Sequence, residues 1–482
     1  MANGIIARQV DAAALPVNAA VGFYPCYMGM SPIWQVDRAD WADLAGSVIV
    51  ASSIADVREK IGYSAPQSGA WPKELSLSMA AYYHTNIERI LPVIMIVNAA
   101  AVPLKAGNVT KSITFVKGQA VIEDPYAVLS TLAVKVGDAS KTKGTDYTAA
   151  YDDDGQNVVI TALTDIEGAT ATYRAVDAES ITFSADTYKL IDFIGQEAKG
   201  VPSTIAAPNW EDATDSAGGR VGTRIAEICE GVVDKHWFVQ GFVQLSGQSR
   251  SAAIAAKESL TSAKVKACWP WAKIGSYIYP MSMIFSAKKQ KVDSENDGIP
   301  YESASNEHVD ITCLCDASGN LIKQLELEAD ELNAAGVATM AFTTAMEWRT
   351  WGVCMANYSE SGRGEIPPNK LNDAAVQMMD YVCNDFELRY GNMVHKPMSI
   401  REVNDILNSF SGVIRELVST GRLIAGTITF EASKNSTADL ADGQFTYTIL
   451  ETNTPPAKAI IGVVSYDSEA LDSYYAAQGG EE

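Results

Sequence analysis

The sequence predicts a multidomain protein of mixed α/β and α+β class: an α/β core with an inserted all-β domain, and a C-terminal helix-plus-strands domain with extended N- and C-terminal arms. Buried strands and helices alternate between residues 46 and 97, which is typical of a parallel sheet. Short strands separated by turns replace that pattern from residue 102 onward. After Pro397 come a capped amphipathic helix, a strand pair and an apolar terminal stretch.

The chain has 482 residues, which is too long for one compact core, so we expect several domains. The predicted segments are an N-terminal arm (1–20), the first part of the core (21–101), an inserted β-sandwich-like domain (102–185), the second part of the core (186–396), a C-terminal domain (397–454) and a C-terminal arm (455–482).

Within the core, apolar runs predict buried strands, and capping residues followed by 3.6-residue periodicity predict helices. The N-terminal residues 4–7 are strand-prone, although an unstructured terminus fits them equally well. Strands are expected at residues 47–50, 91–97, 237–245 and 309–314, and helices at 53–61, 73–87, 225–233, 252–262 and 373–387. In the inserted domain, strands are expected at 112–115, 132–136, 158–160, 171–173 and 181–183, with a hairpin tip at 152–155.

The helix after Pro397 is the clearest element in the chain. Ser399 and Glu402 form a capping box, and Gly421 ends the helix. The residues that repeat at three- and four-residue steps are Ile400, Val403, Ile406, Leu407, Phe410, Val413, Ile414, Leu417 and Val418. A strand pair with period-two alternation follows, carried by Ile428, Phe430, Phe445, Tyr447 and Ile449.

Residues 457–466 form a terminal stretch that is apolar on both faces of an extended chain, behind Pro455 and Pro456. A strand of that kind expects neighbours on both sides. It pairs either with the sheet of another subunit or with the chain's own sheet, and the pattern does not distinguish the two.

Composition excludes several classes of partner. The net charge of −22 argues against nucleic acid and against anionic membranes, which both require clustered Lys and Arg. The longest apolar run, residues 90–104, is interrupted by two prolines and is too short for membrane insertion. Seven cysteines without a Cys-x-x-Cys motif indicate free thiols in a reducing compartment, and no signal peptide is expected.

Motifs for chemistry are absent from the sequence. There is no phosphate-binding loop, no zinc-protease motif and no nucleophile elbow, and residues 218–222 fit a helix-initiating loop. His308 with Cys313 and Cys315 fits no zinc spacing, and Asp152, Asp153 and Asp154 lack the pattern of a calcium loop. We therefore expect no catalytic residue, no metal site, no cofactor and no enzymatic activity.

Three stretches carry a resemblance to a known family. Residues 298–306, 332–339 and 348–352 closely resemble the core of the contractile tail sheath proteins of bacteriophages. The capped helix and strand pair look like the C-terminal domain of that family. The β module, with Tyr147 and Tyr151 before Gly155, resembles its inserted domain.

The resemblance implies a structural subunit that polymerises around a tail tube and contracts to drive the tube through the host envelope for genome ejection. It implies an N-terminal arm with Ile5, Ile6 and Val10, and acceptor strands with the five residues of the strand pair. It implies a donated C-terminal strand with Ala459, Ile460, Ile461, Val463, Val464 and Tyr466. The candidates for a tube-facing helix surface are Arg401, Glu402, Asp405, Arg415 and Glu416.

The partners implied are other copies of the chain, a tail tube protein, and baseplate and tail terminator proteins, in a virion assembled in the bacterial cytoplasm. A sheath of a phage-derived injection machine, such as a tailocin, fits the sequence equally well. An α/β hydrolase is the rival of a different class, and a carbohydrate-binding function of the β insertion is a third hypothesis.

Overall fold

The computed structural model describes residues 23–197, 200–231 and 237–478. The core is an eight-stranded sheet in the order β2-β4-β1-β12-β13-β14-β19-β20. All neighbours are parallel except the two edge pairs, β2–β4 and β19–β20. The strands are β1 (Phe23–Gly29), β2 (Val48–Ala51), β4 (Val93–Val97), β12 (Val201–Ala206), β13 (Gln240–Gln244), β14 (Val265–Cys268), β19 (Val337–Phe342) and β20 (Trp348–Trp351).

The central strands are buried and mostly apolar because helices and loops cover both faces of the sheet. Every residue of β4, β13 and β14 is buried, as a parallel sheet requires. Helix α6 runs along β1, β12, β13 and β14. The helices of this part are α1 (Ile54–Ile61), α2 (Ser76–Tyr82), α3 (Ile194–Glu197), α4 (Val221–Gly231), α5 (Arg250–Lys257), α6 (Met281–Glu295) and α7 (Glu326–Ala334).

A smaller five-stranded sheet packs beside the core in the order β18-β17-β15-β16-β3. Its strands are β3 (Gly69–Ala70), β15 (Trp271–Ile274), β16 (Tyr277–Pro280), β17 (Cys313–Cys315) and β18 (Leu321–Ile322). Only the last part of the strand expected at 309–314 therefore forms a strand. Val309 and Ile311 are buried, so their apolar pattern reflects packing rather than a longer ladder.

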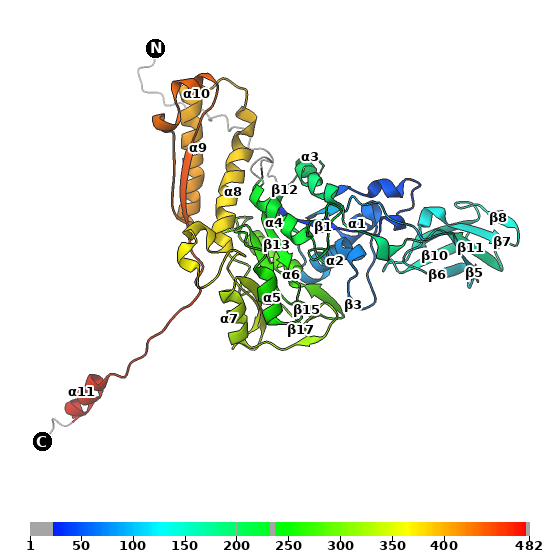
Figure 1. Ribbon diagram of the computed structural model, residues 1–482, viewed down its shortest axis with the longest axis horizontal. Coiled ribbons are helices and arrows are strands. Elements are labelled where there is room, and N and C mark those ends of the chain that lie inside the picture. Colours follow the sequence, from blue (N-terminus) through cyan, green and yellow to red (C-terminus); the bar gives the residue numbers. More distant parts are fainter. Residues whose placement is uncertain (1–22, 198–199, 232–236, 479–482) are drawn as a thin grey trace, which may run out of the picture.

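Residues 109–173 form two antiparallel sheets, β6-β10-β9 and β5-β11-β7-β8, which share a separate hydrophobic core. The strands are β5 (Val109–Ile113), β6 (Gln119–Glu123), β7 (Ala133–Val136), β8 (Ala139–Lys141), β9 (Tyr147–Tyr151), β10 (Asn157–Ala162) and β11 (Ala169–Tyr173). This β module lies at one end of the molecule (Figure 1). The prediction of a strand at 181–183 is wrong. These residues form no strand, and Ile181 and Phe183 are buried in the main hydrophobic core instead.

At the opposite end stand the long helices α8 (Asp373–Tyr390) and α9 (Ile400–Ser419), beside the hairpin of β21 (Leu423–Thr429) and β22 (Thr448–Asn453) (Figure 1). A short helix, α10 (Thr437–Ala441), lies in the hairpin loop, and α11 (Ser468–Gln478) lies at the far end of the C-terminal arm. A third hydrophobic core joins α8, α9 and the hairpin.

Candidate assembly surfaces

Helix α9 positions the first candidate surface. Ser399 caps it as expected: the Arg401 N–H donates to the Ser399 Oγ at 3.2 Å, and the Ser399 N–H donates to the Glu402 Oε2 at 2.9 Å. The Ser399 hydroxyl also donates to the Glu402 Oε2, and this bond is the main cause that lowers the pKa of Glu402. The apolar stripe is buried at Val403, Ile406, Phe410, Ile414 and Leu417. Ile400, the first residue of the helix, is the exception, with 73% of its surface exposed.

The polar face of α9 points away from that core. Arg401, Asp405, Arg415 and Glu416 are exposed, and Glu402 is half-buried. Arg401 and Asp405 form a loose ion pair at 3.8 Å, which contributes little to stability at such exposure. The face therefore presents both signs of charge to a partner.

The hairpin of β21 and β22 is a two-stranded sheet on its own, with no further strand on either side among the described residues. Ile428 and Ile449 pair across it and face α9. Leu450 and Ile424 lie on the outer side and are 63% and 57% exposed. Two free edges and an apolar outer side make this hairpin a template for added strands.

The prediction that the strand pair includes Phe430, Phe445 and Tyr447 is wrong, because all three lie just outside β21 and β22. The hairpin loop is longer than a tight turn and contains α10, so the ladder stops at Thr429 and Thr448. The rings still meet: Phe430 packs on Phe445 with centroids 6.4 Å apart and on Tyr447 at 5.2 Å. Aromatic packing thus extends the hairpin where backbone pairing has ended.

Asn435 holds this loop in place, and sequence analysis missed it. Its side-chain N–H donates to the Glu431 and Thr446 carbonyls, and the Thr446 N–H donates back to its Oδ1 at 2.7 Å. The side chain is 6% exposed. A lone Asn in a polar loop gives no pattern by which this role can be recognised.

Two contacts fix the point where the C-terminal arm leaves the body of the protein. The Thr454 hydroxyl donates to the Gly421 carbonyl at 2.8 Å, and the Lys458 Nζ lies 4.0 Å from the centre of the Tyr358 ring. Such a cation–π contact holds the arm against the core. Sequence analysis missed Lys458 as well; the available signal was that it is the only basic residue after Pro455.

Beyond Lys458 the arm runs away from the body without pairing to its own sheet (Figure 1). Its large apolar side chains are almost fully exposed: Ile460 93%, Ile461 83%, Val463 89%, Val464 96% and Tyr466 77%. Ala459 is exposed too. Soluble proteins rarely expose a contiguous apolar run of this kind without a partner for it.

The other predicted arm residues, Ile5, Ile6 and Val10, lie outside the described residues. No helix of the described chain is both long enough and apolar enough to cross a membrane. Likewise, the described residues contain no group of three His, Cys, Asp or Glu side chains arranged to hold a metal. Each of the seven cysteines is free.

Two buried groups bear on the hydrolase hypothesis. His84 lies 2.7 Å from the Tyr27 hydroxyl, and burial lowers its pKa to about 4. Glu211 accepts a hydrogen bond from the Ser282 hydroxyl at 2.7 Å, and burial raises its pKa to about 8. His84 bonds to a tyrosine and Glu211 to a serine, so these two groups are not parts of one Ser–His–acid triad.

The overall arrangement is that of a known class. No family model matches the chain. Among solved structures, it is similar to a chain of the anti-feeding prophage baseplate (TM-score 0.57, 13% identity, covering 97% of this chain and 99% of that one). It is also similar to the contracted helical sheath of the anti-feeding prophage (0.56, 14%, 96% and 99%) and to the sheath tail protein of Desulfitobacterium hafniense (0.51, 12%, 94% and 100%). The fold is that of contractile sheath proteins.

A curated relative agrees with this class. The tail sheath protein of Burkholderia phage BcepMu is 21% identical over 358 residues, which cover 73% of this chain and 66% of that protein, just under two thirds of its length. The predicted resemblance to contractile tail sheath proteins is therefore confirmed, and so is the mixed α/β, multi-sheet fold class.

Proposed function

We propose that the chain is the structural sheath subunit of a contractile tail, which polymerises as a helical sheath around a tube and contracts to drive that tube through a host cell envelope. The observation that carries the proposal is the exposed apolar arm on a body with the sheath fold. The protein acts as a mechanical part and not as an enzyme.

The arm's role follows from its chemistry. Burial of Ile460, Ile461, Val463 and Val464 is worth about 1.5–3 kcal/mol each. Ordering of the arm costs about 1–2 kcal/mol per residue, so one arm binds marginally. A lattice of arms binds firmly, because each bond raises the effective concentration for the next. The acceptor is the hairpin of a neighbouring copy, next to Ile428 and Ile449, and the N-terminal arm with Ile5, Ile6 and Val10 adds to it in the same way.

Under this proposal the polar face of α9, with Arg401, Glu402, Asp405, Arg415 and Glu416, faces the tube. A mixed-charge face suits an interface that must slide during contraction, because it forms no dry apolar contact. The further partners are a tail tube protein, a baseplate and a tail terminator protein. The place of action is the virion, after assembly in the host cytoplasm.

A second candidate is the sheath of a phage-derived injection machine without a genome. Two of the similar solved structures come from the anti-feeding prophage, whereas the curated relative comes from a phage. Electron microscopy of the native particle separates the two: a DNA-filled head on the contractile tail supports the phage assignment.

The arm provides the test. Replacing Ile461 and Val463 together with Asp, or deleting residues 455–482, is expected to give a folded monomer that forms no tubes. Electron microscopy and sedimentation measure assembly, and thermal unfolding measures the fold. The unfolding temperature of the doubly substituted chain is expected to stay unchanged, because the Ile461 and Val463 side chains contact little of their own molecule.

Tyr475→Asp is the matched control. Tyr475 lies on the same arm, in α11, and is 66% exposed, but it is outside the apolar run. Tubes of normal length are expected from this variant. Normal tubes from the doubly charged variant would overturn the proposal.

A further inference from the structure

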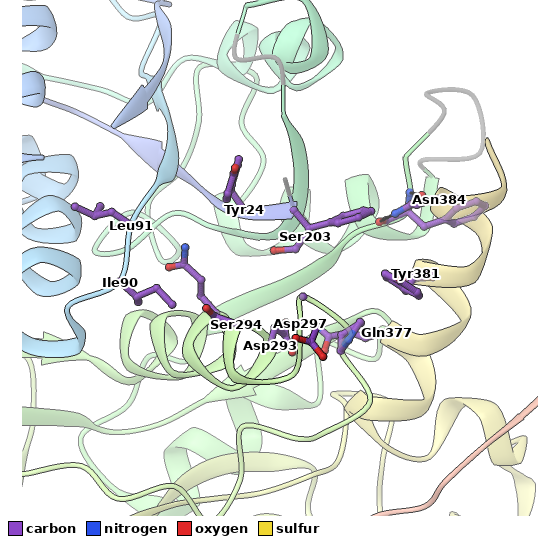
Figure 2. A pocket seen from close by; sticks show the side chains of 16 residues that line it. Tyr24, Ile90, Leu91, Ser203, Asp293, Ser294, Asp297, Gln377, Tyr381 and Asn384 are labelled. Atoms are coloured by element: carbon purple, nitrogen blue, oxygen red, sulfur yellow. Dashed lines mark hydrogen bonds between the residues drawn. The ribbon is translucent and has the colours of Figure 1, made fainter. Parts of the chain in front are cut away.

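A cavity of about 320 Å³ lies at the amino ends of the parallel strands, between α6 and α8. Tyr24 of β1 and Ser203 of β12 line one side of it. Asp293 at the end of α6 and Gln377 of α8 line the other (Figure 2). Ligands of open α/β sheets usually bind at the opposite, carboxyl ends of the strands. The cavity is therefore a feature separate from an enzyme-like site and from the assembly surfaces above.

The charged side chains among the described residues that line the cavity are all hydrogen-bond acceptors. Three carboxylates line it, those of Asp293, Asp297 and Asp380. No Lys, Arg or His is among the described residues that line it. Among the amides of the lining, Gln290 uses one side-chain N–H on the Pro92 carbonyl at 2.7 Å, and Asn384 uses one on the Phe238 carbonyl at 2.9 Å.

Three acceptors on residues that line the cavity have no hydrogen-bond partner among the described residues: the Gln290 Oε1, the Gln377 Oε1 and the Asp380 Oδ2. Gln377 and Asp380 are the most buried of the three, at only 4% and 6% exposed. They lie one turn apart on α8, so they face the same side of the helix. Buried acceptors without a partner are rare in folded proteins, and a pair of them beside a cavity points to a missing donor.

Each carboxylate has a basic partner that is not part of the cavity lining. Lys264 pairs with the Asp380 Oδ1, Lys289 with Asp293, and Arg422 with Asp297 at 2.6 Å, but none of the three bases lines the cavity. Burial still raises the pKa of Asp380 and of Asp293 above the usual value, even with these lysines present. A donor on the cavity side would stabilise the charged form of either carboxylate.

We propose that this cavity binds a guanidinium or ammonium group carried on a short aliphatic stem. Such a head group has several N–H donors and no acceptor, which complements Gln377 Oε1, Asp380 Oδ2 and the neighbouring carboxylates. The stem lies against the apolar walls formed by Tyr24, Leu91, Phe238 and Tyr381. The shared chemistry is that of an arginine or lysine side chain from another copy and that of a free alkylamine or alkylguanidine.

Isothermal titration of the monomeric, assembly-defective chain (Ile461→Asp with Val463→Asp) tests the proposal with n-butylguanidinium and n-butylammonium as probes. Saturable binding at one site is expected for at least one of them. Neutral n-butylurea brings a carbonyl acceptor into the same shape and is expected to bind at least tenfold more weakly. Equal binding of n-butylurea, or no saturable binding of either cation at millimolar concentration, would overturn the proposal.

Gln377→Leu is the test variant, because it removes one acceptor and leaves the Asp380–Lys264 ion pair intact. The affinity for the cation is expected to fall at least tenfold. Cys383→Ser is the control on the same helix: Cys383 is exposed, does not line the cavity, and is expected to leave the affinity unchanged. Equal affinities in the two variants would place the probe elsewhere and refute the site.

Assembled tubes of the unmodified chain distinguish the two sources of the ligand. If a side chain of a neighbouring copy fills the cavity, tubes bind no probe, and the probe slows assembly of the free subunit. If the natural ligand is a free small cation, tubes and monomers bind the probe alike. Either result supports the site.

Discussion

Glu211 shows how the fold sets the chemistry of one residue. It follows β12 at the carboxyl end of the main sheet and is 3% exposed. Its hydrogen-bond partners are the Ser282 hydroxyl and nearby backbone groups, and it has no basic partner among the described residues. Burial penalises the charged carboxylate and raises the pKa to about 8. In the unfolded chain the same group ionises near its usual value of about 4.3. Above that pH, the folded protein therefore keeps the Glu211 carboxyl group protonated, whereas the unfolded chain releases the proton.

The sign of the pH dependence follows. The folded state binds the extra proton between about pH 4.5 and pH 8, so the free energy of unfolding falls as the pH rises through that window. Glu211→Gln keeps the shape and needs no proton. We expect it to be more stable than the parent by roughly 2–4 kcal/mol at pH 8 and equally stable at pH 4. Urea unfolding of the main sheet at the two pH values measures the difference; an equal difference at both would contradict the assignment.

At the scale of elements, the C-terminal domain depends on close packing of α9 on β21. Gly426 of β21 makes this possible. A Cβ at that position would lie 2.7 Å from the Ile414 Cγ2 of α9 and 3.3 Å from the Leu450 carbonyl oxygen of β22. The glycine is thus required by the short distance between helix and hairpin and not by an unusual backbone angle.

Gly426→Val is expected to push α9 off the hairpin and to destabilise the C-terminal domain by about 1–3 kcal/mol. Hydrogen exchange of the α9 amides measures this locally. Ala425→Val is the matched control, because Ala425 is the neighbouring residue in β21 and is exposed. It is expected to leave exchange unchanged or slightly slower, since valine favours strands. Equal exchange in both variants would argue against tight packing at Gly426.

At the scale of the whole molecule, the net charge of −22 opposes the association of identical subunits. The arms must overcome this repulsion to form a polymer. Salt screens charge over a Debye length that falls to about 8 Å at physiological ionic strength. Apolar strand addition is little affected by that screening.

Raising NaCl from about 20 to 200 mM is therefore expected to promote assembly, as followed by light scattering. The chain without residues 455–482 is the control and is expected to stay monomeric at both concentrations. Dissolution of tubes by salt would show that ion pairs, such as those available on the polar face of α9, dominate the contacts instead.

Local patterns determined much of the protein. The capping box at Ser399 and the 3.6-residue stripe of α9 are interactions between near neighbours, so the sequence alone specifies them. The buried strand at Val93–Val97 and the parallel sheet were predictable for the same reason. The exposed arm was predictable as an apolar run that lacks local partners, though its pairing with a neighbour stays a prediction.

Only the tertiary structure decided what depends on distant segments. The cavity joins Tyr24, Asp293 and Gln377, which are more than 80 residues apart along the chain, so no spacing rule reveals it. The contact of Lys458 with Tyr358 and the end of the ladder before Phe430 have the same origin. Helix periodicity and helix caps depend on residues a few positions apart. Cavities, the contacts at the base of the arm and the ends of strands depend on which distant surfaces the folded chain brings together.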